Sequence, residues 1–222
     1  MNNTPVLLYG ASGHAKVIVD ILNQMKSVKI IGVIDAVLPK GASFCDIPIL
    51  GNDDMAKEIL LKHPETQCFV AIGDNWIRNK VVEQIRSFQP SVKFVNAIHP
   101  RAIIAANVKL GEGICVMAGA VVNPFSEISD FVIVNTNSSI DHDCVLCQYC
   151  SIAPRAALGG GVVVNDYSAI SIGASIKHGV KIGAHAVVGA GAVVLKNIED
   201  NAVYYGVPAK FQRTRIKGER YL

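Results

Sequence analysis

Asp141, His142 and Asp143 place three titratable side chains in consecutive positions of FVIVNTNSSIDHDCVLCQYC, a stretch that otherwise reads as buried strand. A carboxylate that holds an imidazole raises its basicity and fixes its tautomer, which a general base requires. The triplet therefore predicts His142 as a catalytic base supported by its flanking acids. The alternative interpretation is a solvated turn histidine without a chemical role.

A six-residue repeat surrounds this triplet. From Ile104 to Val194 every sixth residue is a branched aliphatic, at sixteen positions in all, and the residue two places earlier is usually small. A short fixed period is typical of a solenoid whose units bury their apolar faces by stacking. Hexapeptide proteins form left-handed parallel β-helices with three hexads in each coil, so sixteen hexads predict about five coils. His142 falls at or near a turn between two hexads.

Gly160 lies 18 residues after His142, which is one coil further along the same edge. Adjacent coils are about 4.8 Å apart, so Gly160 is expected to stack beside the imidazole and to leave exposed backbone there. This arrangement leaves room for a thioester. A backbone amide near Gly160 is also the expected donor for an oxyanion.

Two groups of residues raise metal interpretations, and the repeat disfavours both. Cys144 and Cys150 occupy small corner positions on different corners, with Cys147 between them, so they cannot converge on one ion as a structural zinc site requires. His178 lies two coils from His142, nearly 10 Å away along the stack, which disfavours zinc chemistry of the γ-carbonic-anhydrase kind within one chain. The sequence predicts no metal site.

The first part of the chain has a different rhythm. VLLYG, HAKVIVDILNQM and VKIIGVID alternate strand, helix and strand, and further helices and strands follow. This pattern predicts a small parallel α/β domain of the Rossmann type over residues 1–97. The β-helix follows over residues 98–200, and a locally basic tail, interpreted as a solvated end, covers residues 201–222.

The first strand-to-helix turn carries Gly10, Ser12, Gly13 and His14. Backbone amides and the positive end of a helix can receive phosphate there, although the spacing is not that of a dinucleotide fingerprint. Asp35 ends the second strand, where it can accept hydrogen bonds from a base or ribose. The turn therefore favours a nucleoside-diphosphate site, with an ordinary tight turn as the alternative.

Five motifs occur in one order along nearly the whole chain: YGASGHAKVIVD, VAIGDNWIR, NAIHP, VNTNSSIDHDC and YYGVPAK. Together they resemble the bacterial nucleotide-amino-sugar N-acetyltransferases, including the bacillosamine-pathway and GDP-perosamine enzymes, with sialic acid O-acetyltransferases as close relatives. The resemblance implies transfer of an acetyl group from acetyl-CoA to the amine of a nucleotide-linked 4-amino-4,6-dideoxy sugar for surface glycan biosynthesis, UDP-linked in preference to GDP-linked. It also implies a homotrimer with acetyl-CoA between neighbouring β-helices.

The same resemblance assigns residues to roles. His142 takes the place of the catalytic base and Asp143 that of its carboxylate partner. The positions on the nucleotide-sugar motifs are Gly10, Ser12, Gly13, His14, Asp35, Asp74, Asn75 and Arg78. The positions on the coenzyme stretches are Gly160, Ile172, Gly189, Ala190 and Pro208. The chain departs from the family at Ser151, where several members carry a second histidine, and at Cys147, where a turn glycine is usual.

Composition limits the other function classes. The net charge of +3 is too weak and dispersed for a nucleic-acid surface, and no apolar run reaches the roughly 18–20 residues of a membrane span. The cysteine spacing and the absence of a signal-peptide pattern favour a cytoplasmic protein. Two alternatives to N-acetylation stay open: O-acetylation of a sialic-acid-like nonulosonate, and a non-catalytic trimeric scaffold.

Overall fold

The computed structural model describes residues 3–221 and divides into two units. The described residues of Met1–Gly73 and Ile77–Pro100 form the first unit, and those of Asp74–Trp76 and Arg101–Leu222 form the second. A three-residue segment from the middle of the first unit's sequence thus belongs to the second. The chain therefore crosses between the units three times, whereas the sequence predicted one boundary near residue 97.

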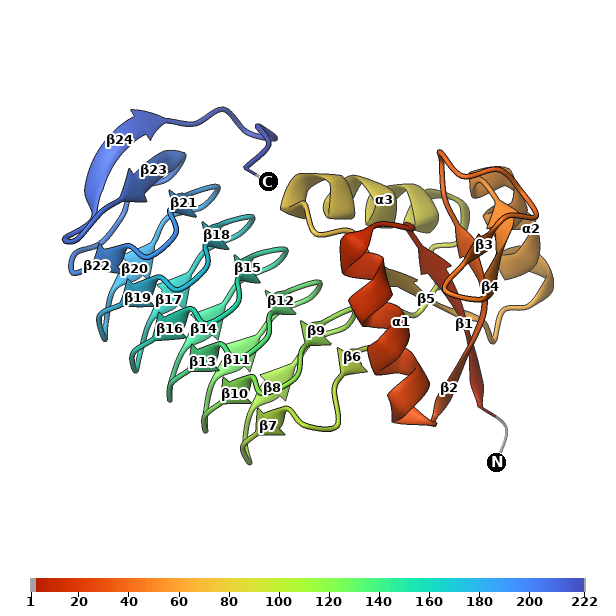
Figure 1. The fold of residues 1–222 in the computed structure, drawn as a ribbon, viewed down its shortest axis with the longest axis horizontal. Helices are drawn as coiled ribbons and strands as arrows, with labels where there is room; N and C mark the ends of the chain where they lie inside the picture. Colours follow the sequence, from red (N-terminus) through yellow and green to blue (C-terminus); the bar gives the residue numbers. More distant parts are fainter. Residues whose placement is uncertain (1–2, 222) are drawn as a thin grey trace. The chain divides into compact units, whose positions relative to one another are not determined.

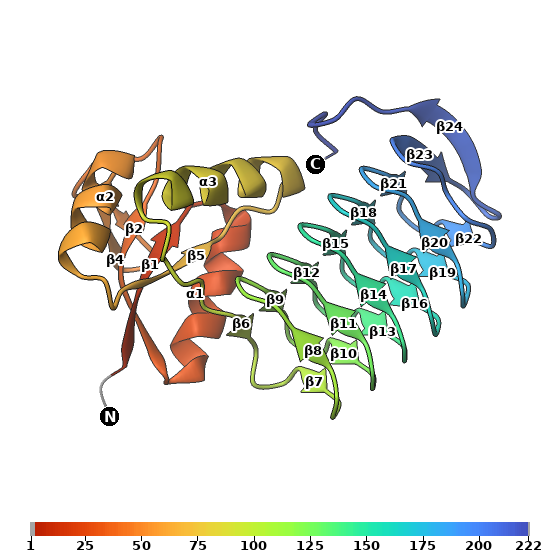
Figure 2. The same ribbon diagram turned by 180° about the vertical axis from the view of Figure 1, so that it is seen from behind.

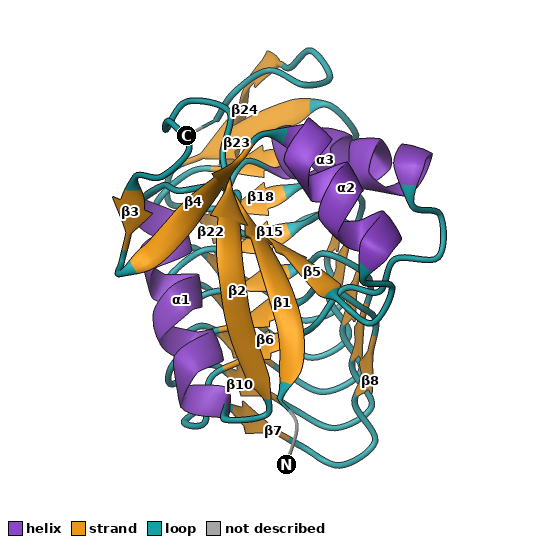
Figure 3. Cartoon of the chain, turned by 90° about the vertical axis from the view of Figure 1, so that its right-hand side faces the viewer, coloured by secondary structure: helices purple, strands orange, loops and turns teal. Residues whose placement is uncertain are grey.

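The first unit is a mainly parallel sheet in the order β3-β4-β2-β1-β5, with only β3 and β4 paired antiparallel. Because the β1-α1-β2 and β4-α2-β5 crossovers run in opposite directions across the sheet, their common right-handedness puts α1 and α2 on opposite faces (Figure 3). The elements are β1 (Thr4–Tyr9), α1 (Gly13–Met25), β2 (Val28–Ile34), β3 (Ser43–Phe44), β4 (Ile47–Gly51), α2 (Asp53–Lys62), β5 (Gln67–Val70), α3 (Asn75–Phe88) and β6 (Ala97–Ile98).

Local sequence explains where α1 and α2 begin and end. Ser12 is the N-cap of α1 in an extended conformation, and the helix stops at Lys26, which adopts a left-handed conformation with φ of 57°. In α2, the side chain of Asn52 accepts a hydrogen bond from the Asp54 amide, and Asp53 and Asp54 add negative charge to the first turn. Both features stabilise the helix N-terminus.

The order of the first sheet reverses at β1, with β2 on one side and β5 on the other. In open parallel sheets, ligands bind outside the carboxyl ends of the strands at such a switch point. Gly10 ends β1 there with φ of +98°, and a Cβ on it would lie 3.3 Å from the Ala71 carbonyl oxygen. Only glycine combines this conformation with so close an approach to the chain after β5.

The second unit is a left-handed parallel β-helix with three faces (Figures 1 and 2). Each strand pairs with the strand 18 residues further on, as in the match of Val121 to Ser139. The first face holds β7 (Ile103–Ile104), β10 (Val121–Val122), β13 (Ser139–Ile140), β16 (Ala157–Leu158), β19 (Ser175–Ile176) and β22 (Val193–Val194). The second holds β8 (Lys109–Leu110), β11 (Glu127–Ile128), β14 (Val145–Leu146), β17 (Val163–Val164) and β20 (Lys181–Ile182). The third holds β9 (Cys115–Val116), β12 (Ile133–Val134), β15 (Ser151–Ile152), β18 (Ala169–Ile170), β21 (Val187–Val188), β23 (Ala202–Tyr205) and β24 (Lys210–Thr214).

The six-residue repeat forms the core of this unit. Fourteen of the sixteen repeat positions, from Val116 to Val194, are at most 3% exposed. Ile104 and Leu110 are only half-buried because they belong to the first coil, which has a following coil but no preceding one. Cys144 and Cys150 are fully buried at small corner positions, as the repeat predicted.

Three columns of left-handed residues mark the corners of the coils. One column stacks aromatic rings: Phe131 on Tyr149, Tyr149 on Tyr167 and Tyr167 on His185, with centroids 4.7–5.3 Å apart. Trp76 adds its indole to Tyr167 and His185 at 5.5 and 5.7 Å. We call Phe131, Tyr149, Tyr167 and His185 the aromatic column.

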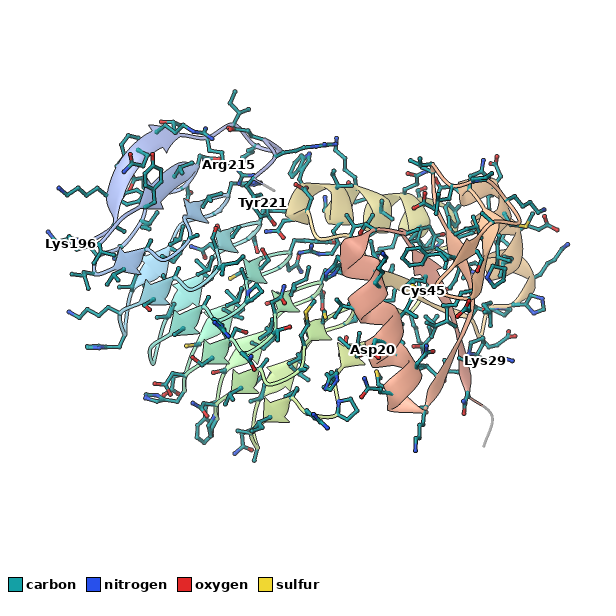
Figure 4. The ribbon with its side chains drawn as sticks, in the orientation of Figure 1. Asp20, Lys29, Cys45, Lys196, Arg215 and Tyr221 are labelled. Atoms are coloured by element: carbon teal, nitrogen blue, oxygen red, sulfur yellow. The ribbon has the colours of Figure 1, made fainter. Side chains whose placement is uncertain are left out.

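The C-terminal tail is partly packed. β24 is exposed and pairs antiparallel with β23, but Arg215 is only 4% exposed and donates a hydrogen bond to the His185 carbonyl oxygen at 3.0 Å. Its guanidinium lies 5.2 Å from the Tyr221 ring centroid, and both side chains are seen near the C-terminus in Figure 4. The interpretation of the whole tail as a solvated end is therefore wrong. No helix within residues 3–221 is long and apolar enough to cross a membrane.

Candidate active site

His142 sits in the turn between β13 and β14, with its side chain 60% exposed. Its Nδ1 lies 2.7 Å from Oδ2 of Asp143, which is also exposed. Because the carboxylate accepts a hydrogen bond from Nδ1–H, the neutral ring presents Nε2 as its open proton acceptor. The geometry therefore provides an oriented imidazole at the surface of the coil.

Asp143 is one of the left-handed corner residues, with φ of 57°. Aspartate and asparagine tolerate this conformation better than most residues, so the corner allows a carboxylate immediately after the histidine. Asp141 has a different role. One of its oxygens accepts hydrogen bonds from the His142 amide at 2.8 Å and from the Asn123 side chain at 3.1 Å, which fixes the turn.

The pKa of His142 is raised, first by the hydrogen bond to Asp143 and then by the charge of Asp141. A higher pKa makes the imidazole a stronger base when it is deprotonated. The two acids therefore divide the work: Asp143 holds and activates the ring, and Asp141 mainly orders the backbone around it.

Gly160 stacks against the imidazole, as the 18-residue spacing predicted. A Cβ at this position would lie 2.6 Å from both Nε2 and Cε1 of His142, so any side chain would displace the ring. The amides here already have partners in the chain. Gly159 donates to Ile176, Gly161 donates to the His142 carbonyl, and the Gly160 amide helps to lower the pKa of Asp141. Gly160 thus supplies space beside the base rather than a free oxyanion donor.

Replacing Asp143 with asparagine is expected to lower kcat by less than loss of the imidazole does. The pKa of His142 falls when its main stabilising carboxylate is removed, so the acidic limb of the pH–rate profile shifts to lower pH. Asparagine suits the left-handed corner, so the melting temperature should change little. Asp141→Asn serves as the matched control, with a smaller shift of the limb, and an unshifted limb in Asp143→Asn would contradict this role.

The residues expected to line the coenzyme path lie on two edges of one β-helix. Gly160 shares the edge of His142, whereas Ile172 and Ala190 stack 18 residues apart on another edge, joined by the hydrogen bond from the Gly191 amide to the Ile172 carbonyl. Both are exposed, Ile172 by 59%. Gly189 donates its amide to Tyr204, and Pro208 helps to line a cavity of about 310 Å³ together with Lys196 and Tyr204.

In the first unit, the β1–α1 turn brings together Gly10, Ser12, Gly13 and His14. The Ser12 side chain caps no amide, and a Cβ on Gly13 would meet nothing within 4 Å, so this surface is open. Within the described chain, the buried Nε2 of His14 has no hydrogen-bond partner. Burial and then the charge of Arg78 lower the pKa of His14 to about 4, so the ring is neutral at pH 7.

The segment after β5 has structural contacts of its own. Asp74 accepts the Trp76 amide at 3.0 Å at the start of α3, and Arg78 donates to the carbonyls of Ile72 and Gly73 at 2.9 Å each. Asn75 is 1% exposed, and its amide donates to the Tyr167 and Ser168 carbonyls. These hydrogen bonds give Asn75 and Arg78 positioning roles within the fold.

Known proteins share this architecture. Residues 5–85 match the family model of the PglD N-terminal domain. PerB from Caulobacter crescentus, solved in complex with CoA and GDP-perosamine, superimposes with a TM-score of 0.87 and 37% sequence identity over 94% of this chain and 97% of PerB. The chain belongs to the bacterial nucleotide-amino-sugar N-acetyltransferases.

Two curated relatives carry the same activity in their names. The GDP-perosamine N-acetyltransferase of Escherichia coli O157:H7 is 28% identical over 174 residues, 75% of each chain. The UDP-N-acetylbacillosamine N-acetyltransferase of Bacillus subtilis is 30% identical over 116 residues, 51% of each chain. The family prediction made from the five motifs is confirmed. In this N-acetyltransferase, no described residues form a group of three or more His, Cys, Asp or Glu suited to a metal ion.

Asp35 of this N-acetyltransferase is already bound to its own chain. Its Oδ2 accepts the Ala11 amide at 2.9 Å, and its Oδ1 accepts the amides of Val37 and Leu38 at 2.9 and 3.0 Å. The carboxylate therefore ties the β1–α1 turn to the loop after β2. This geometry favours a role in shaping the nucleotide site over direct reading of the base.

Asp35→Ala is accordingly expected to raise KM for the nucleotide sugar about tenfold and to leave KM for acetyl-CoA nearly unchanged. Three backbone amides lose their acceptor, so both loops of the α/β unit loosen, while the β-helix keeps its contacts. Steady-state kinetics with each substrate varied in turn measure the split. Equal increases in both constants would indicate general misfolding instead.

Several structural residues escaped the sequence analysis. Phe131, Tyr149, Tyr167 and His185 recur every 18 residues, so the period alone carried a signal for the aromatic column. Tyr9 and Asp53 of the first unit showed no such signal. They read as a strand residue and a helix-capping acid, and only the fold brings them to one cavity.

Proposed function

We propose that this N-acetyltransferase transfers the acetyl group of acetyl-CoA to the C4 amine of a nucleoside-diphosphate-linked 4-amino-4,6-dideoxy sugar. One observation carries the proposal: His142 is held by Asp143 through Nδ1, while Nε2 lies beside the side-chain-free Gly160. The complex of PerB with CoA and GDP-perosamine supports this choice of donor and acceptor class. Products of this kind serve surface glycan biosynthesis.

The reaction is direct transfer within a ternary complex. The sugar nitrogen attacks the thioester carbonyl carbon, and Nε2 of His142 accepts the proton that this nitrogen loses. The tetrahedral intermediate collapses, the C–S bond breaks, and the CoA thiolate takes the proton back from the imidazolium. Asp143 stabilises the imidazolium while it exists.

An acyl-enzyme is not part of this mechanism. Cys144 is the cysteine nearest to His142 in sequence, but it is fully buried, and burial raises the pKa of its thiol. A nucleophilic cysteine needs an exposed thiolate. The histidine therefore acts as a base toward the sugar amine.

The proposal includes a homotrimer. Because Gly160 and His142 occupy one edge of the β-helix and Ile172 and Ala190 occupy another, one chain alone presents these surfaces separately. A neighbouring β-helix can face one edge with the other, and a closed threefold assembly repeats that contact. We also propose a cytoplasmic location, supported by the free thiols of all six cysteines.

We favour GDP as the nucleotide, although the motifs alone favoured UDP. Of the relatives compared, the one with the highest identity and coverage was solved with GDP-perosamine. An acceptor panel tests the proposal: GDP-perosamine, a UDP-4-amino-4,6-dideoxy sugar, CMP-linked and free nonulosonates, each with acetyl-CoA and detection of released thiol. Acetylation of either amino sugar supports it. Activity only on nonulosonates supports O-acetylation, and no binding of any sugar or acetyl-CoA below about 1 mM supports a scaffold.

A further inference from the structure

A cavity of about 220 Å³ lies at the switch point of the first sheet. Tyr9 and Gly10 at the end of β1 line it together with Ile72 after β5. Asn52 and Asp53 at the start of α2 contribute the polar part of another wall. Its volume is below the roughly 300–1,000 Å³ of sites that enclose a whole drug-sized ligand, so it suits one portion of a nucleotide sugar.

The lining selects among the three portions of such a substrate. Ile34, Ile72, Ile77 and Val81 make most of the wall apolar. Its charged lining groups are the carboxylates of Asp35 and Asp53, which would repel a diphosphate. A sugar ring would place hydroxyls against aliphatic carbon, at a cost in desolvation. A heterocyclic base presents apolar faces and a polar edge, which matches the cavity.

Two polar side chains in the cavity have hydrogen-bonding capacity left. Tyr9 is 3% exposed, and its buried hydroxyl has no partner among the described residues. Asp53 accepts one hydrogen bond, from Gln84 at 2.8 Å, whereas a carboxylate can accept about four. Asp35 differs, since both of its oxygens already accept backbone amides.

The two groups lie close enough to influence each other. Burial raises the pKa of Tyr9, and the charges of Cys68 and Asp53 raise it further. Burial also raises the pKa of Asp53, followed by the charge of Asp54. A ligand that donates hydrogen bonds to the carboxylate would compensate this desolvation, and one that accepts from the hydroxyl would satisfy its lone donor.

We propose that Asp53 reads the base of the nucleotide sugar and selects guanine over uracil. This inference rests on the proposed function. The polar edge of guanine carries two adjacent donors, N1–H and the N2 amino group, followed by the O6 acceptor. A carboxylate accepts both donors side by side, and the Tyr9 hydroxyl supplies a donor for O6.

Uracil pairs less well with the same groups. Its single donor, N3–H, lies between two carbonyl oxygens. A carboxylate facing N3–H therefore meets one attractive and at least one repulsive contact. A bidentate pair of this type is worth roughly 5- to 150-fold in discrimination against the wrong base.

Asp53→Asn tests the assignment, with Asp54→Asn as the matched control. Both acids lie in the first turn of α2, so each substitution weakens the interaction with the helix N-terminus similarly. Asp54 lines a neighbouring cavity and not this one. Isothermal titration with GDP, UDP and inosine diphosphate, which lacks the N2 amino group, measures the base preference of the full-length protein.

The wild type and Asp54→Asn should bind GDP more tightly than both UDP and inosine diphosphate. Asp53→Asn should bind GDP roughly 5- to 150-fold more weakly and UDP no more weakly, because a carboxamide offers uracil one acceptor and one donor. Equal binding of GDP and inosine diphosphate by the wild type, or an unchanged GDP preference in Asp53→Asn, would overturn the assignment.

The acceptor panel separates this inference from the proposed function. Acetylation of a nucleotide-linked amino sugar with a base preference that ignores Asp53 refutes only the reading of guanine. Tight, Asp53-dependent binding of GDP without acetylation of any amino sugar refutes the proposed reaction and leaves the nucleotide site in place.

Discussion

His142→Ala is expected to lower kcat by roughly 10²- to 10⁴-fold, the usual contribution of a positioned general base. The side chain is 60% exposed and its one printed contact is with Asp143, so its loss should change the melting temperature little. KM for both substrates should stay within a few-fold of the wild type, because the base acts on the proton and not on binding. Initial rates with saturating substrates, measured beside thermal unfolding, test this.

A second histidine offers a matched control for that experiment. His63 is also exposed and lies 3.4 Å from an acid, Glu65, but it belongs to the end of α2. His63→Ala removes a similar surface pair and should leave kcat unchanged. Added imidazole should restore part of the turnover of His142→Ala and none of any loss elsewhere. If His142→Ala kept near-normal turnover at pH 7, the triplet would belong to substrate binding or to subunit contacts.

Gly160→Ala is expected to lower kcat about 10²-fold although it adds a single methyl group. The new Cβ would lie 2.6 Å from Nε2 of His142, so the ring must move by an ångström or more. Displacement of a catalytic group by that distance costs about two orders of magnitude. The φ angle of Gly160 is not in the left-handed range, so alanine fits its backbone and the coil should remain folded.

A double-mutant cycle isolates the steric cause. In the His142→Ala background the imidazole is absent, and the added methyl group has room. Gly160→Ala should then cause almost no further loss of kcat, so the two substitutions should be strongly non-additive. Full additivity would mean that Gly160 acts through the thioester or through the fold instead of through the ring.

The repeat was predictable because its energetics are local and periodic. Each coil buries the same positions against the next, so one aliphatic residue in six, from Val116 to Val194, identified the core and the neighbour of His142. The turn geometry was predictable in the same way, since His142 and Gly160 are separated by one coil. Contacts that repeat along a solenoid need no knowledge of the distant chain.

The α/β unit was harder to interpret because its site is built from segments with no common period. Asp35 stands at the end of β2, as expected, but its saturation by the Ala11 and Val37 amides depends on loop conformation. Asp53 resembles an ordinary acid in the first turn of a helix. Its place beside Tyr9 follows from sheet order, which pairs strands far apart in the sequence.

The short segment Asp74–Trp76 also constrains how such an enzyme can diversify. It lies within the sequence of the sugar-nucleotide unit, yet its Asn75 amide binds the carbonyls of Tyr167 and Ser168, and its Trp76 ring contacts the aromatic column. Recombination that joined a foreign nucleotide-binding unit to this β-helix would need to carry three compatible residues with it. A crossover near residue 97 alone would leave two buried carbonyls without their donor, so new specificities are more accessible through substitutions around the switch-point cavity than through exchange of whole units.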